Sequence, residues 1–105
     1  MRILFDQGTP VPLRQVFTTH SVATAFERGW STLSNGDLLA AAEREGFDLF
    51  VSTDQNLRYQ QRIADRKLAV LVLPTTSWPV IRLHAAEITT ALSRIRAGDF
   101  LELKW

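Results

Sequence analysis

The sequence predicts a small three-layer α/β domain, in which helices cover both faces of a mostly parallel central sheet of about five strands. Two observations support this fold class. Short unbroken apolar runs at residues 3–5, 49–51 and 68–73 are typical of strands that are buried on both faces. Segments with helical spacing separate these runs, and the alternation of strands and helices indicates a parallel sheet. Ligands of such folds bind beyond the carboxyl ends of the strands.

The first part of the chain contains a strong strand and a weak one. The strand at residues 3–5 stops at Asp6, and a loop with glycine and proline leads into a helical pattern at residues 13–17. Residues 20–25 are expected to form a weak second strand. Residues 26–33 fit neither the helical nor the strand pattern, so we assign them no element.

The next predicted helix has clear signals at both ends. It covers residues 37–45 and buries a face of leucine and alanine, with Ser34 or Asn35 as its N-cap. Gly46 ends it, because glycine readily adopts the left-handed conformation that closes a helix. The buried strand at residues 49–51 follows directly.

The second half of the chain continues the alternation. A polar helix is predicted over residues 55–66. The run at residues 68–73 is the most apolar of the chain, so we place it centrally in the sheet. The last helix begins at Ser77, with a proline just inside its first turn, and continues at helical spacing to Ile95. Residues 100–105 alternate in hydropathy, which suits a half-exposed edge strand.

The composition is that of an ordinary globular protein. The chain has 105 residues, 46% of them hydrophobic and 22% charged, which fits a single domain over residues 1–105. It has no cysteine, which excludes disulfides and thiolate chemistry and is typical of the cytoplasm. We expect neither a signal peptide nor a membrane segment. With a net charge of +1, any basic footprint for nucleic acid would have to be local.

Three aspartates stand near the predicted carboxyl edge of the sheet. Asp6 ends the first strand, Asp54 follows the third, and Asp37 lies in the first turn of the intervening helix. If they converge, their mutual repulsion favours a bound cation, and hard oxygen ligands suit Mg²⁺ or Mn²⁺. We therefore expect a metal site that hydrolyses nucleic-acid phosphodiesters. Asp48 opens its strand, so we place it at the opposite edge.

Each of these aspartates also has a purely structural interpretation. Asp6 can form an Asx turn with the loop that follows it, Asp37 can complement a helix dipole, and Asp54 can be a plain N-cap. Nearby polar residues are candidate substrate contacts, since arginine suits phosphate and tyrosine suits base stacking, but they can equally be turn or helix-surface residues. These candidates are Gln7, Asn35, Thr53, Asn56, Arg58, Tyr59 and Arg62.

Three segments carry the acids in a recurring context. They read Met-Arg-Ile-Leu-Phe-Asp up to Asp6, Gly-Asp-Leu-Leu-Ala-Ala-Ala around Asp37, and Leu-Phe-Val-Ser-Thr-Asp up to Asp54. Together they resemble the PIN-like domains, nucleases that include toxins of bacterial toxin–antitoxin pairs. Those domains carry an acid after the first strand, an acid that opens a helix, and a strand that ends in Thr-Asp or Thr-x-Asp. The resemblance covers most of the chain and is closest to a compact bacterial and archaeal group.

The resemblance implies a Mg²⁺- or Mn²⁺-dependent ribonuclease, with Asp6, Asp37 and Asp54 as metal ligands and catalytic residues. It also implies RNA as substrate, a homodimer and, for a toxin, a neighbouring antitoxin protein. Two positions depart from the pattern. PIN nucleases have a further acid on an intervening helix, where this chain offers only Glu27, and compact relatives often have an acid where this chain has Gln7. Fewer carboxylates predict weaker metal affinity.

These departures keep an alternative function open, a non-catalytic PIN-like module that binds RNA or a protein partner. RNA binding without metal-dependent turnover would distinguish such a module from a nuclease. A phosphatase-like or receiver-like α/β domain would share the acidic edge, but no phosphate-accepting motif and no following lysine stand out in the sequence.

Overall fold

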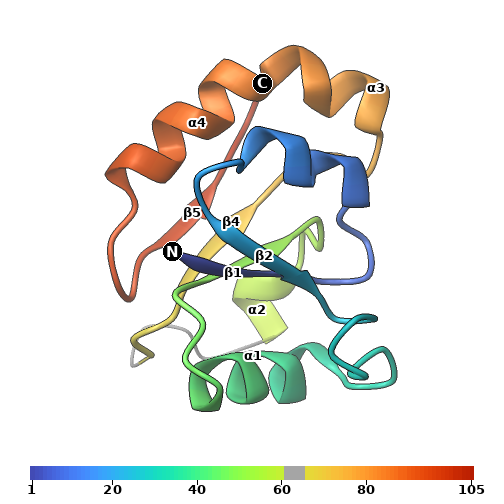
Figure 1. Ribbon diagram of the computed structural model, residues 1–105, viewed down its shortest axis with the longest axis vertical. Coiled ribbons are helices and arrows are strands. Elements are labelled where there is room, and N and C mark those ends of the chain that lie inside the picture. The colour runs from blue at the N-terminus through green and yellow to red at the C-terminus, as the bar shows by residue number, and fades with distance from the viewer. Residues whose placement is uncertain (61–65) are drawn as a thin grey trace.

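The structure, a computed structural model that describes residues 1–60 and 66–105, contains a five-stranded, all-parallel sheet (Figure 1). The strands are ordered β2-β1-β3-β4-β5, and each neighbouring pair is parallel. This sheet confirms the predicted α/β fold. The elements in chain order are β1 (Arg2–Phe5), the 3₁₀ helix η1 (Val11–Val16), β2 (Ser21–Thr24), α1 (Asn35–Arg44), β3 (Leu49–Ser52), α2 (Leu57–Gln60), β4 (Ala69–Val72), α3 (Trp78–Ile81), the 3₁₀ helix η2 (Arg82–His84), α4 (Ala85–Arg94) and β5 (Phe100–Glu102).

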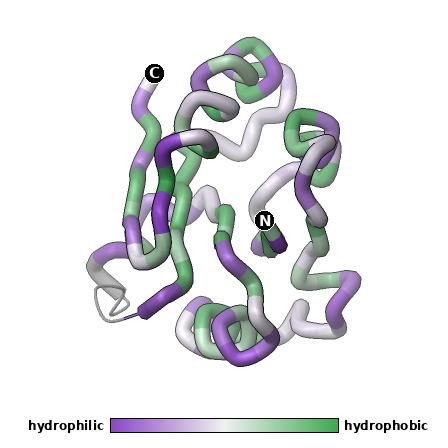
Figure 2. Tube along the Cα trace, turned by 60° about the vertical axis from the view of Figure 1, so that its left-hand side comes forward, coloured by the Kyte–Doolittle hydropathy of each residue, from purple (hydrophilic) through white to green (hydrophobic). Residues whose placement is uncertain are grey.

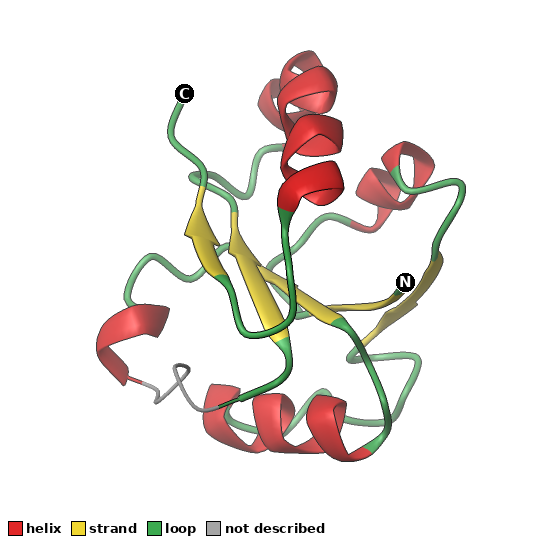
Figure 3. Ribbon diagram, turned by 90° about the vertical axis from the view of Figure 1, so that its left-hand side faces the viewer, coloured by secondary structure: helices red, strands yellow, loops and turns green. Residues whose placement is uncertain are grey.

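The two faces of the sheet bury separate apolar clusters, because successive side chains of a strand point to opposite faces. On one face, Ile3 and Phe5 of β1 pack in a cluster with residues of η1, α3 and α4. On the other face, Leu4 and Phe50 belong to a cluster with residues of α1 and α2. Figure 3 shows α4 and α1 on opposite sides of the strands. The unbroken apolar runs of the sequence are thus explained by burial on both faces.

Helix α1 has the ends that the sequence predicts. Ser34 is its N-cap, and the Ser34 side chain accepts a hydrogen bond from the backbone N–H of Asp37. Gly46 follows the helix with φ of +79°, a conformation that glycine adopts without strain. Hydrophobic and hydrophilic residues alternate around the turns of the helix (Figure 2). The buried face, which packs on the sheet, consists of Leu38, Leu39, Ala41 and Ala42.

The strands differ in exposure according to their place in the sheet. β4 is buried throughout and is paired on both sides, as expected for the most apolar run, although β3 occupies the middle of the sheet. β2 and β5 are the edge strands. β5 covers only Phe100–Glu102, shorter than predicted, and its residues are half-buried. Asp48 lies at the amino end of the sheet, where it accepts a hydrogen bond of 2.8 Å from the backbone N–H of Arg2. This is the edge opposite to the aspartates of interest, as predicted.

One predicted helical segment differs in type from the structure, and another is only partly described. The segment predicted over residues 13–17 is the 3₁₀ helix η1. The predicted helix over residues 55–66 contains the α2 turn, and residues 61–65 lie outside the described residues. None of the helices in the described ranges combines the length and the apolar character needed to cross a membrane.

The prediction of one continuous last helix is wrong, because α3 and α4 are separated by the 3₁₀ turn η2. At this turn the His84 ring stacks on Trp105, with ring centroids 4.3 Å apart and planes inclined by 8°. The His84 Nδ1 atom also lies 2.6 Å from a carboxylate oxygen of Glu87. Apolar periodicity continues through the break, since Ile81 and Ile88 both face the core, and this continuity hides the turn in the sequence.

We expect Leu39→Ala to lower the free energy of unfolding by about 2–5 kcal/mol, because Leu39 is fully buried between α1 and the sheet and its loss leaves a cavity. Urea unfolding followed by circular dichroism measures this change. Leu83→Ala is the matched control, since Leu83 is 75% exposed and its truncation should change stability by less than about 0.5 kcal/mol. Equal effects of the two substitutions would contradict the burial of α1.

Candidate functional site

The strand order reverses between β1 and β3. After β1 the chain places β2 on one side of it and then β3 on the other side. In open α/β sheets, such a reversal creates a crevice beyond the carboxyl ends of the two strands, and ligands bind there. Asp6 follows β1 directly, and Asp54 comes two residues after the end of β3. Two of the three predicted acids therefore lie where the topology favours a ligand.

The Asp6 carboxylate is buried, and both of its oxygens accept hydrogen bonds. It is 8% exposed. Its Oδ1 atom accepts hydrogen bonds from the backbone N–H of Thr9 at 3.0 Å and from the Thr9 hydroxyl at 2.6 Å. Its Oδ2 atom accepts a hydrogen bond from the Ser52 hydroxyl at 2.6 Å. The bonds to Thr9 form the local turn of the structural interpretation, and all three bonds together hold the carboxylate in one orientation.

Ser52 links the two aspartates. It is fully buried at the end of β3, which pairs with β1. Its hydroxyl donates to Asp6 and accepts a hydrogen bond of 3.0 Å from the backbone N–H of Asp54. The donor and the acceptor capacity of one hydroxyl are therefore both used. Ser52 thus fixes the position of the Asp54 backbone relative to the Asp6 side chain.

Asp54 is held by the start of α1. Its Oδ2 atom accepts a hydrogen bond of 2.7 Å from the Asn35 side-chain amide, and its Oδ1 atom accepts one of 2.9 Å from the backbone N–H of Asn56. The second bond is an Asx turn, in keeping with the structural interpretation. Because Ser34 caps α1, Asn35 becomes the first helical residue and its side chain reaches Asp54. The sequence left open which of these two residues is the cap.

These side chains surround a cavity of about 430 Å³. The predicted site residues that line it are Asp6, Gln7, Asn35, Thr53 and Asp54. Gly8 lines it as well and lies close to Thr53, because a Cβ atom at this position would be 2.6 Å from the Thr53 hydroxyl. The Gln7 amide donates a hydrogen bond to the backbone carbonyl of Ser31, on the loop before α1.

Asp37 does not share this cavity. It is exposed in the first turn of α1, and its backbone N–H bonds to the Ser34 cap. Within residues 1–60 and 66–105, no three His, Cys, Asp or Glu side chains are grouped so that they could hold a metal ion. A Mg²⁺ site, however, commonly uses only one or two carboxylates and completes its octahedron with water and substrate. The role of Asp37 stays a prediction.

Of the remaining candidates, Asn56 and Arg58 do not line the cavity. Asn56 contributes its backbone N–H to Asp54, and its side chain is exposed. Arg58 forms an ion pair of 3.2 Å with Glu102 and lies over the ring of Phe100, so it connects α2 to β5. Tyr59 belongs to α2, whereas Arg62 lies outside the described residues.

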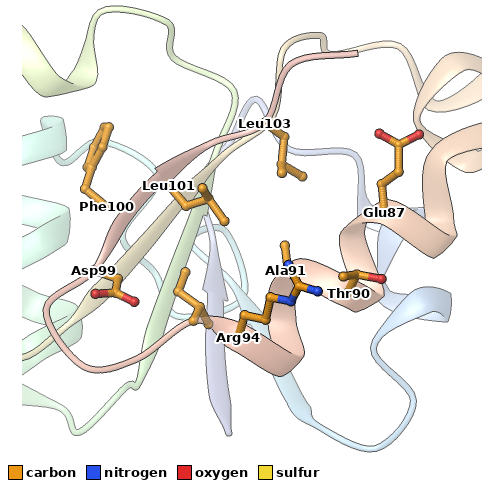
Figure 4. A pocket seen from close by; sticks show the side chains of 9 residues that line it. Glu87, Thr90, Ala91, Arg94, Asp99, Phe100, Leu101 and Leu103 are labelled. Atoms are coloured by element: carbon orange, nitrogen blue, oxygen red, sulfur yellow. The ribbon is translucent and has the colours of Figure 1, made fainter.

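A separate cavity of about 420 Å³ lies between α4 and β5 (Figure 4). Arg94 and Glu87 extend from the helix side, and Leu101 and Leu103 line the strand side. Among the described residues, none of the predicted site residues lines this cavity, and it lies along an edge strand and not at the strand reversal. This cavity is therefore separate from the candidate site that contains Asp6 and Asp54.

The cavity lined by Asp6 and Asp54, here called the acidic cavity, contains oxygen atoms that suit a divalent cation. Among the described residues, no Arg or Lys forms an ion pair with Asp6 or Asp54. Two carboxylates, a hydroxyl at Thr53 and the amide oxygen of Asn35 are hard oxygen donors, which suit Mg²⁺ or Mn²⁺. The cavity volume leaves room for the waters that complete an octahedral shell. The residues present therefore fit such an ion.

Glu27 has a structural role. It forms an ion pair with Arg14, and its carboxylate accepts a hydrogen bond of 2.9 Å from the backbone N–H of Thr24. The Thr24 hydroxyl in turn accepts one of 3.1 Å from the backbone N–H of Glu27. The hydrogen bond from Arg14 is the main reason that the pKa of Glu27 is lowered, and the Thr24 N–H adds to the shift. Glu27 does not line the cavity with Asp54, so it does not supply a fourth acid there.

Two site residues were not anticipated. Thr9 and Ser52 hold Asp6 from both sides, and neither was among the candidates. The available signal was the position of Ser52, a small polar residue at the carboxyl end of an apolar run and level with Asp6. Only the pairing of β1 with β3 shows that its hydroxyl meets that carboxylate.

Comparison of the chain with protein-family models, with curated proteins and with solved structures finds no match. The fold and the candidate site therefore rest on the geometry described above. The resemblance to PIN-like domains stays a prediction from the three acidic segments.

We expect Ser52→Ala to lower the free energy of unfolding by about 1–3 kcal/mol, because it leaves a buried oxygen of Asp6 without its partner. Chemical unfolding measures the loss. Ser93→Ala removes a hydroxyl that bonds to a helix carbonyl at the surface, and it should have an effect below about 0.5 kcal/mol. A Ser52 variant as stable as the Ser93 variant would contradict the bridging role.

We expect Arg14→Gln to raise the pKa of Glu27 toward its ordinary value of 4.5, measured by NMR titration of the side-chain carboxyl carbon. The lowered pKa belongs to the folded state, so this interaction stabilises the protein above about pH 4.5 and is lost as the pH falls through the folded-state pKa. The stability difference between wild type and variant should therefore shrink in acid. An unchanged titration of Glu27 would show that Arg14 is not the cause.

Proposed function

We propose that the chain is a metal-dependent ribonuclease of the PIN-like type, which hydrolyses RNA phosphodiesters. The observation that supports this most directly is the pair Asp6 and Asp54, which line one cavity at the carboxyl ends of adjacent parallel strands. Oxygen donors of this kind favour hard divalent cations, which serve phosphodiester hydrolysis. The choice of RNA as the substrate comes from the resemblance to PIN-like domains.

The residues of the cavity have distinct tasks under this proposal. Asp6 and Asp54 hold the cation, while Ser52 orients the first carboxylate and Asn35 the second. Gly8 also lines the cavity, in which a phosphate group and a water molecule would lie. When bound, Mg²⁺ or Mn²⁺ supplies positive charge that stabilises a phosphodiester under attack by water. Asp37 is proposed as a third ligand on the resemblance alone.

The biological setting belongs to the same proposal. A toxin of a toxin–antitoxin pair would act on cytoplasmic RNA as a homodimer and would be neutralised by an antitoxin protein. The support for these features is the resemblance of the segments around Asp6, Asp37 and Asp54 to compact PIN-like domains.

The alternative proposal is a non-catalytic PIN-like module that binds RNA or a protein partner. It is favoured by the hydrogen bonds that both oxygens of Asp6 and both oxygens of Asp54 already accept within the chain. Carboxylates used in this way can serve the fold alone, as turn-forming residues do. RNA binding that continues without metal-dependent turnover would favour this alternative.

We expect Asp6→Asn and Asp54→Asn each to lower Mg²⁺-dependent cleavage of single-stranded RNA by about 100-fold or more, since ligand loss should cost at least as much as loss of a residue that supports a ligand. Calorimetry with Mn²⁺ on the same proteins should show weaker binding. Asp37→Asn tests the third ligand in the same assays, and a comparable loss would add Asp37 to the site.

Asp48→Asn is the matched control, because Asp48 lies at the amino end of the sheet and should leave cleavage and metal binding unchanged. Cleavage that resists EDTA, or that survives in the Asp6 and Asp54 variants, would rule out the proposed ribonuclease. Circular dichroism of each variant shows whether the fold is retained.

A further inference from the structure

A second cavity of about 250 Å³ adjoins the acidic one. The two share Asp6, Gln7 and Ser31 in their linings, so they form neighbouring compartments on the same edge of the sheet. Only the second of these two cavities is lined by an aromatic side chain, that of Phe26. A ligand that reaches from one compartment to the other would meet oxygen donors first and then an aromatic ring.

Phe26 is strongly exposed for an aromatic residue. Its exposed fraction is 77%, and that of Val11, which lines the same cavity, is 54%. The adjacent Ala25, by contrast, is fully buried. A ligand that covered the ring would remove apolar surface from water, which favours binding.

The loop that carries Phe26 is held in place at several points. The backbone N–H of Ala25 donates to the carbonyl of Phe5 at 2.9 Å, and that of Trp30 donates to the carbonyl of Ala25 at 2.8 Å. Glu27 is bonded to both Arg14 and the backbone N–H of Thr24. The ring therefore projects from a braced support, and a ligand that stacks on it would not have to order the loop first.

The size and the charge of the second cavity limit what it can bind. About 250 Å³ is smaller than the roughly 300–1,000 Å³ of sites for drug-sized ligands, so a single flat group suits it. Neither cavity is lined by Arg or Lys among the described residues, so attraction to phosphate would depend on the cation that the acidic cavity suits. An exposed aromatic ring binds nucleobases by stacking, regardless of base identity.

We propose that Phe26, together with Val11, forms a nucleobase-stacking subsite that makes the protein selective for single-stranded RNA. The inference rests on the proposed function, since it places a base beside the phosphodiester that Asp6 and Asp54 would address. Bases within a duplex are stacked on one another and cannot reach the Phe26 ring. The subsite therefore accepts unpaired nucleotides of any sequence and rejects paired ones.

The test measures binding of a short single-stranded oligoadenylate that contains 2-aminopurine, whose fluorescence reports stacking. Ca²⁺ replaces Mg²⁺ so that binding is measured separately from cleavage. We expect Phe26→Ala to weaken binding by about fivefold or more and to abolish the stacking signal, while Phe26→Trp retains both. The same oligonucleotide in a duplex should bind the wild type no better than it binds Phe26→Ala.

Leu83→Ala is the control for loss of an exposed apolar side chain, because Leu83 is 75% exposed and lines neither cavity. Equal binding of the strand by wild type and Phe26→Ala, or no binding by the wild type, would overturn the subsite and point to a protein partner for the ring. Cleavage of RNA in Mg²⁺ is scored separately. Cleavage that does not depend on Phe26 would contradict the stacking subsite but not the ribonuclease. Stacking on Phe26 without cleavage would contradict the ribonuclease but not the stacking subsite.

Discussion

The parallel pairing of β1 with β3 is the contact on which the candidate site depends. Its register sets Phe5 opposite Val51, so that the residues that follow each strand emerge side by side. A displacement of one residue would move every apolar side chain of β1 to the wrong face, so the two buried cores fix this register. The Ser52 hydroxyl then meets the Asp6 carboxylate, and its second hydrogen bond places Asp54. The geometry of the acidic cavity is thus a consequence of core packing.

The fold was predictable because the three inner strands, β1, β3 and β4, have strong local signals. Runs such as residues 3–5 and 49–51 are apolar throughout, which is typical of short strands covered on both faces. The helices were harder, since an apolar period of 3.6 does not distinguish one helix from two that share a face. Ile81 and Ile88 keep that period across η2, and the stacking of His84 on Trp105 depends on residues that are far apart in sequence.

The candidate site was predictable in part. Asp6 and Asp54 follow strands, and the parallel sheet brings strand ends together. Asp37 lies on a helix, whose approach to the sheet depends on the irregular loop before it, and sequence patterns do not describe such a loop. The path of this loop also decides whether Ser34 or Asn35 is the N-cap, which the sequence could not settle. Because Ser34 is the cap, the Asn35 side-chain amide is free to donate to Asp54. The contact of the Ser52 hydroxyl with Asp6 joins residues that are far apart in sequence, so no periodic pattern predicts it.

The brevity of the two edge strands bears on how the protein behaves in concentrated solution. β2 has four residues and β5 has three, with Asp99 and Lys104 close to its ends. Edges this short, with charges nearby, offer few free backbone groups to a passing chain and so are poor templates for edge-to-edge assembly. We therefore expect the folded sheet to resist fibril formation, so that any tendency to aggregate would require the apolar segment of β4 to be uncovered first.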